Sequence, residues 1–296
     1  MKTKHTISVL IGVLIVFAIL WILFSRFNGQ SESKVKSNIH NGTKHDVSVV
    51  YINAGRADSI LVQVDGHSFL IDAGLKSYTS KISEVLDKYK VDIFDAVFLT
   101  HPHSDHIGGL KKIAKNYRID RIYASQLSVR DEDNQNEIDK IANKLNIPLT
   151  TLVFSERVKL VDDVYMDVLG PIELNEKDEN DNSLVLSMNI NDRTFLFSGD
   201  MQFAEEVTLM DKGVDVSADI YKISNHGNPD ATLEEFAKKV SPLYAIVTTN
   251  TRIDKDSANK KVLSYFGRSK IYLTQDYNLG ILVTVDSKGK IKVSEA

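Results

Sequence analysis

The order of apolar and polar positions after residue 45 predicts alternating strands and helices. Short apolar or β-branched runs between turn residues are typical of strands, and apolar positions spaced three and four apart are typical of helices. The predicted strands cover residues 47–52, 59–64, 68–71, 96–99, 158–161, 165–169, 184–190, 194–197, 220–223, 245–248, 271–274, 280–285 and 290–293. The predicted helices cover residues 81–89, 107–116, 131–145, 204–210, 233–240 and 255–266.

The order of these elements predicts an α/β fold. The first three strands follow one another closely, which indicates an antiparallel start, and Asn191-Asp192-Arg193 has the composition of a hairpin turn. Strand-rich and helical segments then alternate twice. This pattern favours two β–α halves, with their sheets packed inside and their helices outside.

The N-terminal segment carries a different signal. Residues 7–24 read ISVLIGVLIVFAILWILF and contain no charge. A helix of this length rises about 27 Å, close to the roughly 30 Å hydrocarbon core of a bilayer. We therefore expect residues 1–26 to form a single-pass anchor in the cell membrane. A cleaved signal peptide and a buried helix are the alternatives, but no Ala-x-Ala cleavage site follows the run.

The residues on either side of the apolar run predict the membrane topology and a linker. Lys2 and Lys4 precede the apolar run, which favours a cytoplasmic N-terminus and an extracytoplasmic domain. Residues 27–45 are polar and rich in Ser, Asn, Gly and Lys, so they predict a flexible linker to a domain of residues 46–296. The two linker histidines, His40 and His45, are expected to be solvated surface residues.

Composition narrows the chemistry. The chain has 296 residues and 43% hydrophobic content, enough for a sizeable core, and it has no cysteine. Disulfides, cysteine-based zinc sites and cysteine nucleophiles are therefore excluded, and any metal must be held by His, Asp or Glu. The net charge of −4 weighs against a dedicated duplex-DNA binder, although a local basic groove is compatible with it.

A cluster of metal-binding residue types lies between a predicted strand and a predicted helix, where α/β folds place functional loops. The cluster falls within six residues and comprises His101, His103, Asp105 and His106. Imidazole and carboxylate groups are good ligands for zinc and similar metals. The other five of the eight histidines are scattered over the chain, so the density favours a metal site over a chance surface cluster.

The cluster resembles the His-x-His-x-Asp-His signature of the metallo-β-lactamase superfamily. Three further segments are similar to family motifs and follow in the family's order, each after a β run. They are Leu70-Ile71-Asp72-Ala73-Gly74, Phe197-Ser198-Gly199-Asp200 and Ile223-Ser224-Asn225-His226-Gly227. The resemblance covers residues 47–290 and implies the four-layer αββα sandwich of that family.

The resemblance also implies a two-metal site. By position, the first metal would be bound by His101 and His103, the second by Asp105, His106 and His226, and both by a bridging Asp200. Asp72 is expected to orient the loop or a ligand histidine without binding the metal itself. The implied metal is zinc, one ion or two, with manganese as the alternative. Most of the superfamily supplies another histidine before the bridging aspartate, but none lies between residues 107 and 225 here, so the first site is short of one ligand.

One branch of the superfamily, the hydrolase domain attached to ComEC-type competence DNA-uptake channels, is similar in further motifs. Its Asn-x-x-Ser before a strand is matched by Asn180 and Ser183. Its opening Asp-Val-Gly-Gln-Gly-Asp-Ser is echoed by residues 53–59, which keep Asp58 but differ at Arg56. The resemblance implies that Asp58, Asn180 and Ser183 support the metal ligands.

Two later motifs of that branch have changed. His-His-Gly-Ser becomes Asn225-His226-Gly227-Asn228, and Asn-x-Tyr-Gly-His-Pro is reduced to Asn250 followed by Thr-Arg-Ile. By their positions, Asn225 and Asn250 are the expected substrate contacts. The fold and the metal site are kept in this pattern, whereas the substrate-facing positions have drifted.

The resemblance implies hydrolysis by a metal-activated water, with Asp105 or Asp200 holding the proton of that water. It favours a phosphodiesterase acting on nucleic acid or a cell-envelope polymer. Lys222, Arg252 and Lys255 are candidate phosphate contacts, with ordinary surface cations as the alternative. Hydrolysis of an ester, lactone or amide, and a non-catalytic module that retains a metal, are the other hypotheses. The sequence identifies no protein partner.

Overall fold

The computed structural model describes residues 44–296. The predicted membrane anchor and all but the last two residues of the predicted linker lie outside the described residues. Within residues 44–296, no helix combines the length and the apolar character that a membrane crossing requires.

The prediction for His45 was wrong. Its side chain is buried, and its Nδ1 lies 2.6 Å from a carboxylate oxygen of Asp65. Its backbone N–H also donates to Oδ1 of Asn191, 3.0 Å away. The end of the predicted linker is therefore part of the folded unit, because these contacts tie it to two turns at the rim of the sheets.

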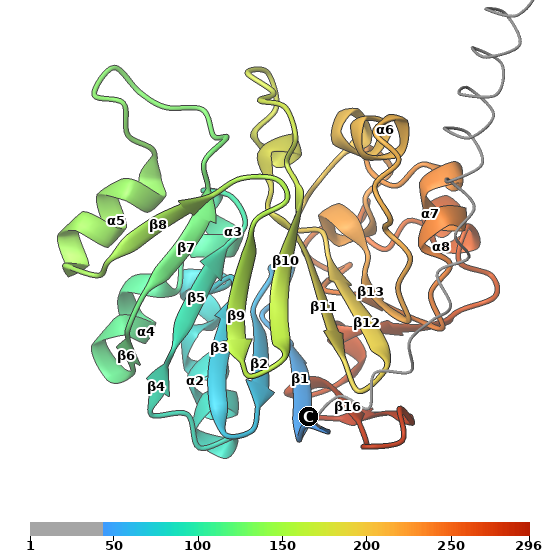
Figure 1. The fold of residues 1–296 in the computed structure, drawn as a ribbon, viewed down its shortest axis with the longest axis horizontal. Helices are drawn as coiled ribbons and strands as arrows, with labels where there is room; N and C mark the ends of the chain where they lie inside the picture. The colour runs from blue at the N-terminus through green and yellow to red at the C-terminus, as the bar shows by residue number, and fades with distance from the viewer. Residues whose placement is uncertain (1–43) are drawn as a thin grey trace, which may run out of the picture. The chain divides into compact units, whose positions relative to one another are not determined.

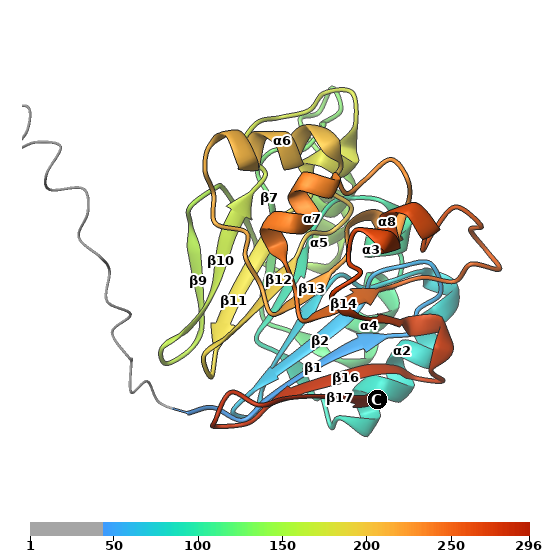
Figure 2. The same cartoon turned by 90° about the vertical axis from the view of Figure 1, so that its right-hand side faces the viewer.

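Two β-sheets form the centre of the fold (Figures 1 and 2). The first has eight strands, in the order β17 (Ile291–Glu295), β16 (Gly280–Val285), β1 (Val47–Ile52), β2 (Ile60–Val64), β3 (His67–Ile71), β5 (Ala96–Leu99), β7 (Ile122–Ser125) and β8 (Leu149–Leu152). The second has seven, in the order β15 (Lys270–Leu273), β14 (Tyr244–Val247), β13 (Ile220–Lys222), β12 (Arg193–Phe197), β11 (Val185–Ile190), β10 (Val164–Gly170) and β9 (Arg157–Val161). The short strands β4 (Ile93–Phe94) and β6 (Arg118–Ile119) pair separately.

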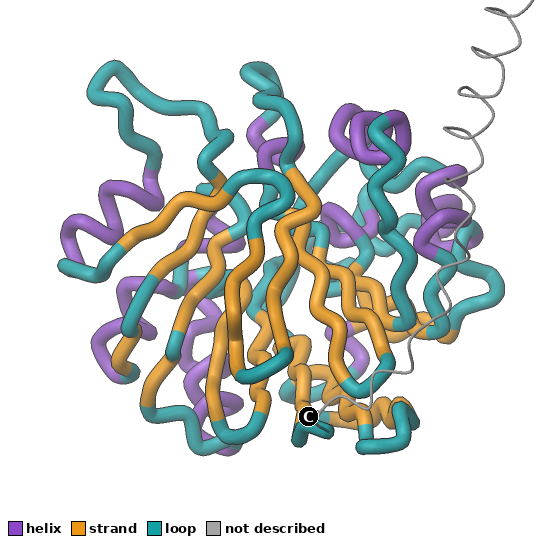
Figure 3. Tube along the Cα trace, in the orientation of Figure 1, coloured by secondary structure: helices purple, strands orange, loops and turns teal. Residues whose placement is uncertain are grey.

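Helices cover the outer face of each sheet, as Figure 3 shows by colour. The first sheet is covered by α2 (Thr79–Lys88), α4 (Leu110–Asn116) and α5 (Glu137–Leu145). The second is covered by α6 (Phe203–Asp211), α7 (Glu234–Val240) and α8 (Lys260–Ser264). A short α3 (Ser104–Ile107) and the 3-10 turns η1 (Lys76–Tyr78), η2 (Glu179–Asn182), η3 (Ser224–Gly227) and η4 (Thr274–Asp276) complete the elements. The layers confirm the predicted αββα sandwich.

Strand β1 shows why the sequence forms this sandwich. Successive side chains of a strand point to opposite faces. Val49 and Tyr51 pack between the two sheets, whereas Val50 and Ile52 pack under the helices of the first sheet. Both faces of the strand are therefore buried, which explains a nearly continuous apolar run in place of strict alternation.

Most predicted strands are confirmed, but three helices differ from their predicted bounds. The helix predicted over residues 131–145 begins at Glu137, because the Asn136 side chain accepts hydrogen bonds from the first turn. The helix predicted over residues 107–116 is broken at Gly108-Gly109 into α3 and α4. The helix predicted over residues 255–266 is reduced to α8.

Helix α6 carries a buried carboxyl group that predicts a pH dependence of stability. The side chain of Glu205 is buried, and one of its oxygens accepts a hydrogen bond from the backbone of Ile172. Burial raises the pKa of Glu205 from 4.5 to about 8, although that hydrogen bond opposes the rise. The folded protein thus holds a proton that the unfolded chain releases, so Glu205 lowers the free energy of unfolding as pH rises from about 4.5 to about 8.

We expect Glu205→Gln to remove this decrease in the free energy of unfolding with rising pH. At pH 9 the variant should exceed the wild type in unfolding free energy by at least about 1 kcal/mol, the equivalent of roughly one pKa unit. At pH 4 the two should be close. Urea unfolding at several pH values measures this, with Glu84→Gln on the exposed side of α2 as the control. Parallel pH profiles for the wild type and Glu205→Gln would contradict the expectation.

Candidate metal centre

The predicted site residues gather where strands of both sheets end. The carboxyl ends of β3 and β5 in the first sheet lead into Asp72 and into the loop with Asp105 and His106. The carboxyl ends of β12 and β13 in the second sheet lead to Asp200 and His226. Since these strands run parallel within each sheet, their ends meet at one edge of the sandwich.

Four buried side chains form a set with metal-binding geometry: Asp105, His106, Asp200 and His226. One ligand atom from each lies within 4.8 Å of the others. Oδ2 of Asp200 is 3.2 Å from Nε2 of both histidines, and Oδ2 of Asp105 is 3.6 Å from Nε2 of His226. The first two of the four residues come from the first half of the fold and the other two from the second.

In both histidines, Nδ1 is held by a polar contact. Nδ1 of His106 lies 2.7 Å from Oδ2 of Asp72, and Nδ1 of His226 donates to the carbonyl of Thr248 at 2.6 Å. In the neutral form of each imidazole, these contacts favour the proton on Nδ1 and leave Nε2 to face the carboxylates. Each Nε2 is buried and makes no hydrogen bond. A histidine that binds a metal usually has one ring nitrogen held by a hydrogen bond and the other free to face the metal. His106 and His226 both have this arrangement, so the set fits a divalent cation such as zinc.

The backbone is strained where two of these contacts originate. Asp72 has a φ of 57°, and the neighbours Asn225 and His226 have φ values of 42° and 54°. Residues other than glycine rarely adopt this left-handed region, and such strain clusters at functional sites. Gly199 has a φ of 52°, and a Cβ there would lie 2.9 Å from Cβ of Ser183, so only glycine lets Asp200 turn into the site.

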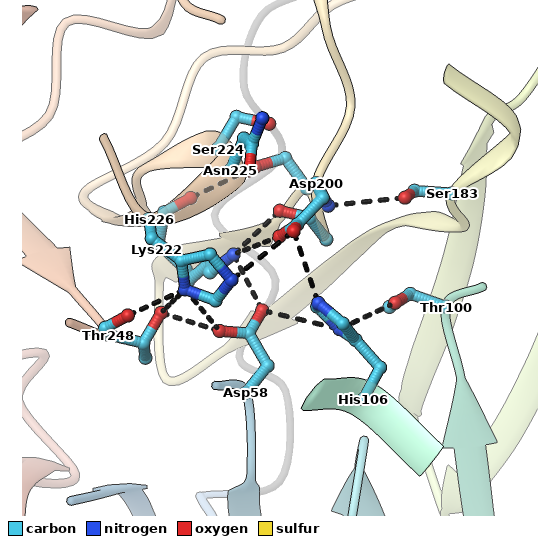
Figure 4. A network of polar contacts seen from close by, with 12 residues as sticks. Asp58, Thr100, His106, Ser183, Asp200, Lys222, Ser224, Asn225, His226 and Thr248 are labelled. Atoms are coloured by element: carbon cyan, nitrogen blue, oxygen red, sulfur yellow. Dashed lines mark hydrogen bonds and ion pairs between the residues drawn. The ribbon is translucent and has the colours of Figure 1, made fainter. Parts of the chain in front are cut away.

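A buried lysine balances part of the negative charge (Figure 4). Nζ of Lys222 lies 2.6 Å from Asp58 and 3.4 Å from Asp200, and it donates to the carbonyl of Gly199 at 2.6 Å. Asp58 also accepts a hydrogen bond from the Thr248 hydroxyl. Both predictions for Lys222, a phosphate contact or a surface cation, were therefore wrong.

The site carries four buried carboxylates, and their balance with nearby cations indicates its capacity for metal. The carboxylates belong to Asp58, Asp72, Asp105 and Asp200. Two fixed cations contact them, the Lys222 ammonium and the Arg56 guanidinium, which lies 2.5 Å from Asp105. Arg56 also pairs with Asp254, so the carboxylates outnumber the fixed cations, and this excess of negative charge favours a bound cation.

The neighbouring charges favour the protonated form of His106 and the ionised form of Asp200. Burial opposes protonation of His106, but the carboxylates of Asp200 and Asp72 outweigh it and keep the pKa of His106 well above its usual range. Burial also favours the neutral form of Asp200, yet His226, His106 and Lys222 hold the pKa of Asp200 well below its usual range. Protons and a metal ion thus compete for the same imidazole nitrogens.

The predicted first-metal histidines do not belong to the four-residue set. Nε2 of His101 lies 3.0 Å from Nδ1 of His103, whose side chain is exposed. Nδ1 of His101 lies 3.2 Å from the Ser183 hydroxyl, which accepts a hydrogen bond from the backbone N–H of Asp200. Ser183 thus links His101 to Asp200. The role of the two histidines as ligands stays a prediction.

The remaining predicted residues lie around this centre. Oδ1 of Asn180 is buried without a hydrogen-bond partner, and its backbone carbonyl accepts from Ser183. Asn225 is buried, donates to Asp230 at 3.1 Å and stays a predicted substrate contact. Asn250 lines a polar pocket of about 190 Å³ together with Arg252, whose side chain is exposed. Lys255 is also exposed.

The contacts of Thr248 with the site were not predicted from the sequence, and neither was the burial of Lys222. Thr248 joins Asp58 to His226, but a threonine at a strand end has no pattern that marks it. Lys222 did carry a signal, since it stands inside the apolar run Ile220-Tyr221-Lys222-Ile223. A lysine flanked in this way on a buried strand requires a buried partner.

Comparisons with known proteins agree with this geometry. The model of the metallo-beta-lactamase superfamily matches residues 52–249. ComE operon protein 3 of Bacillus subtilis is 26% identical over 177 residues, which cover 60% of this chain and 23% of that protein. Exodeoxyribonuclease WalJ of Streptococcus pneumoniae is 30% identical over 94 residues, which cover 31% of this chain and 34% of WalJ.

The chain thus spans about a quarter to a third of the length of these curated relatives. Among solved structures, the metallo-beta-lactamase fold protein YhfI of Bacillus subtilis superposes with a TM-score of 0.55 at 13% identity. The superposition covers 82% of this chain and all of that one, which supports the same fold.

Proposed function

The chain is a metal-dependent hydrolase of the metallo-β-lactamase superfamily, and we propose that it hydrolyses a phosphodiester. The observation that carries this proposal is the buried set of Asp105, His106, Asp200 and His226 with its two unpaired imidazole nitrogens. The similarity to an exodeoxyribonuclease supports a phosphodiester over a carbonyl substrate. The phosphodiester would belong to nucleic acid or to a cell-envelope polymer.

The four ligands would hold one divalent cation, zinc or manganese, which when bound lowers the pKa of a water molecule and draws charge from the phosphoryl oxygens. The chain's own groups do the rest. Asp72 and Thr248 keep the two imidazoles in the orientation that binds metal. Asp105 is more exposed than Asp200, with 12% against 2% of its side chain accessible, so it is placed to orient an incoming water by accepting a hydrogen bond.

Membrane anchoring remains part of the proposal. It rests on the uncharged run of residues 7–24, which lies outside the described residues. With Lys2 and Lys4 on the cytoplasmic side, the hydrolase unit would act outside the cytoplasm, where an envelope polymer or incoming nucleic acid is within reach.

The experiment is metal-dependent hydrolysis of bis-p-nitrophenyl phosphate by the zinc- or manganese-loaded chain. We expect turnover that is lost in His226→Ala, because this change removes one of the two imidazole ligands. A parallel assay uses the neutral ester p-nitrophenyl butyrate. Metal-dependent turnover of the ester alone would favour a carbonyl substrate. Turnover of neither substrate by metal-loaded protein would favour a non-catalytic module.

A further inference from the structure

Arg56 contacts the predicted ligand Asp105, and the side chains of both residues are partly exposed to solvent. Its Nη1 lies 2.5 Å from Oδ2 of Asp105, its Nε donates to Asp254 at 3.1 Å, and its Nη2 lies 3.4 Å from Oδ1 of Asn225. About 27% of the Arg56 side chain is exposed. A guanidinium has five N–H donors, so these three contacts leave two without a partner in the described residues.

The other fixed cation of the site cannot serve the same purpose. Lys222 is 1% exposed, and its three donors face Asp58, Asp200 and the carbonyl of Gly199. Lys222 is therefore buried behind the metal ligands and is not accessible to a substrate. Arg56 combines positive charge, free donors, contact with a ligand carboxylate and access to solvent.

The contacts of Arg56 join distant parts of the fold. Arg56 precedes β2, and Asp254 follows β14. The two residues are far apart in the chain, yet they form an ion pair, and Asn228 also donates to the same Asp254 oxygen. Arg56 thus places a positive charge beside the metal ligands, and Asp254 holds its guanidinium there.

We propose that Arg56 is a specificity-determining residue that binds non-bridging oxygens of the substrate's phosphoryl group, with Asp254 as its positioning residue. The planar guanidinium presents paired donors that match two phosphoryl oxygens, which a neutral ester or amide does not offer. The proposal rests on the proposed function, since it assumes that the group held at the metal is a phosphoryl group.

The test measures anion binding separately from turnover. Inorganic phosphate is titrated calorimetrically into the zinc-loaded full chain and into Arg56→Gln, Arg56→Lys and Arg268→Gln, with zinc content measured for each. We expect Arg56→Gln to raise the Kd for phosphate at least about tenfold, because charge-assisted hydrogen bonds are lost. Arg56→Lys should fall between Arg56→Gln and the wild type. Arg268→Gln, an exposed arginine after α8 with the same charge change, should leave the Kd unchanged.

Kinetics supply a second readout. For bis-p-nitrophenyl phosphate, Arg56→Gln should raise KM by a similar factor, and Asp254→Asn should raise it less. Wild-type affinity for phosphate in metal-loaded Arg56→Gln would overturn the proposal. Loss of zinc in that variant would also overturn it, since Arg56 would then serve to hold Asp105. Arg56-dependent phosphate binding without turnover by the wild type would instead contradict the proposed function.

Discussion

Asp200→Asn is expected to lose the bound metal ion and, with it, the hydrolytic activity. Oδ2 of Asp200 lies 3.2 Å from Nε2 of both ligand histidines, and Oδ1 lies 3.4 Å from Lys222. The amide keeps the shape of the side chain but removes the charge that draws a cation to this point. Loss of a residue that only supports a ligand weakens metal affinity about 10- to 100-fold. Loss of a ligand itself should cost at least about 100-fold.

The measurement is zinc content and affinity of the purified chain, together with kcat. We expect one tightly bound ion in the wild type, because Asp105, His106, Asp200 and His226 form one four-residue ligand set. His103→Ala is an informative partner variant, because His103 is exposed and lies outside the four-residue set, so it should retain this ion. Asp192→Asn, which changes an exposed aspartate, is the control for charge alone. Full zinc affinity in Asp200→Asn, or loss of the ion in His103→Ala, would contradict the assignment of ligands.

Lys222→Met is expected to destabilise the fold by about 3–5 kcal/mol, the typical cost of removing one partner from a buried ion pair. Methionine fits the volume and the apolar surroundings of the lysine stem. The cost arises because Asp58, which is 1% exposed, loses the ammonium that lies 2.6 Å away. Asp200 loses a second, longer contact.

Urea unfolding in the presence of a chelator measures this effect without a contribution from metal. The double variant Lys222→Met/Asp58→Asn should recover part of the lost stability, because the uncompensated charge is gone while the Thr248 hydroxyl keeps an acceptor. Lys238→Met, which breaks an exposed pair with Glu234 on α7, should leave stability nearly unchanged. Equal effects of Lys222→Met and Lys238→Met would refute the buried-pair account.

The layers of the fold were predictable because both sheets are built from short apolar runs with helices between them. Strands β7 and β8 were missed because they are four residues long, and β8 lies at the sheet edge with only Leu152 buried. The predicted start of the last helix, at residue 255, was wrong for a tertiary reason. Ala258 has a φ of 48°, and its N–H donates to the carbonyl of His226, so residues before 259 serve the metal centre and not a helix.

The residues of the candidate site that belong to local sequence motifs were predictable. Asp105 and His106 stand in one dense cluster, and Asp200 and His226 each follow a strand in a recognisable order. Which of these side chains meet depends on how the two sheets face each other, and sequence spacing does not contain this information. The set therefore gathers four of the six predicted ligands and leaves out His101 and His103. The partnership of Arg56 with Asp254 arises from the same long-range packing.

The ligand set draws equally on the two halves of the sandwich, and this gives a bound ion a mechanical role. Asp105 and His106 follow a strand of the eight-stranded sheet, whereas Asp200 and His226 follow strands of the seven-stranded one. An ion coordinated by all four is a cross-link between the sheets at one end of their shared core. At 100 times its Kd, such an ion adds about 2.7 kcal/mol to the free energy of unfolding. A bound ion would therefore hold the two halves together at the edge where these strands end, and we expect a chelator to weaken their packing at that edge first.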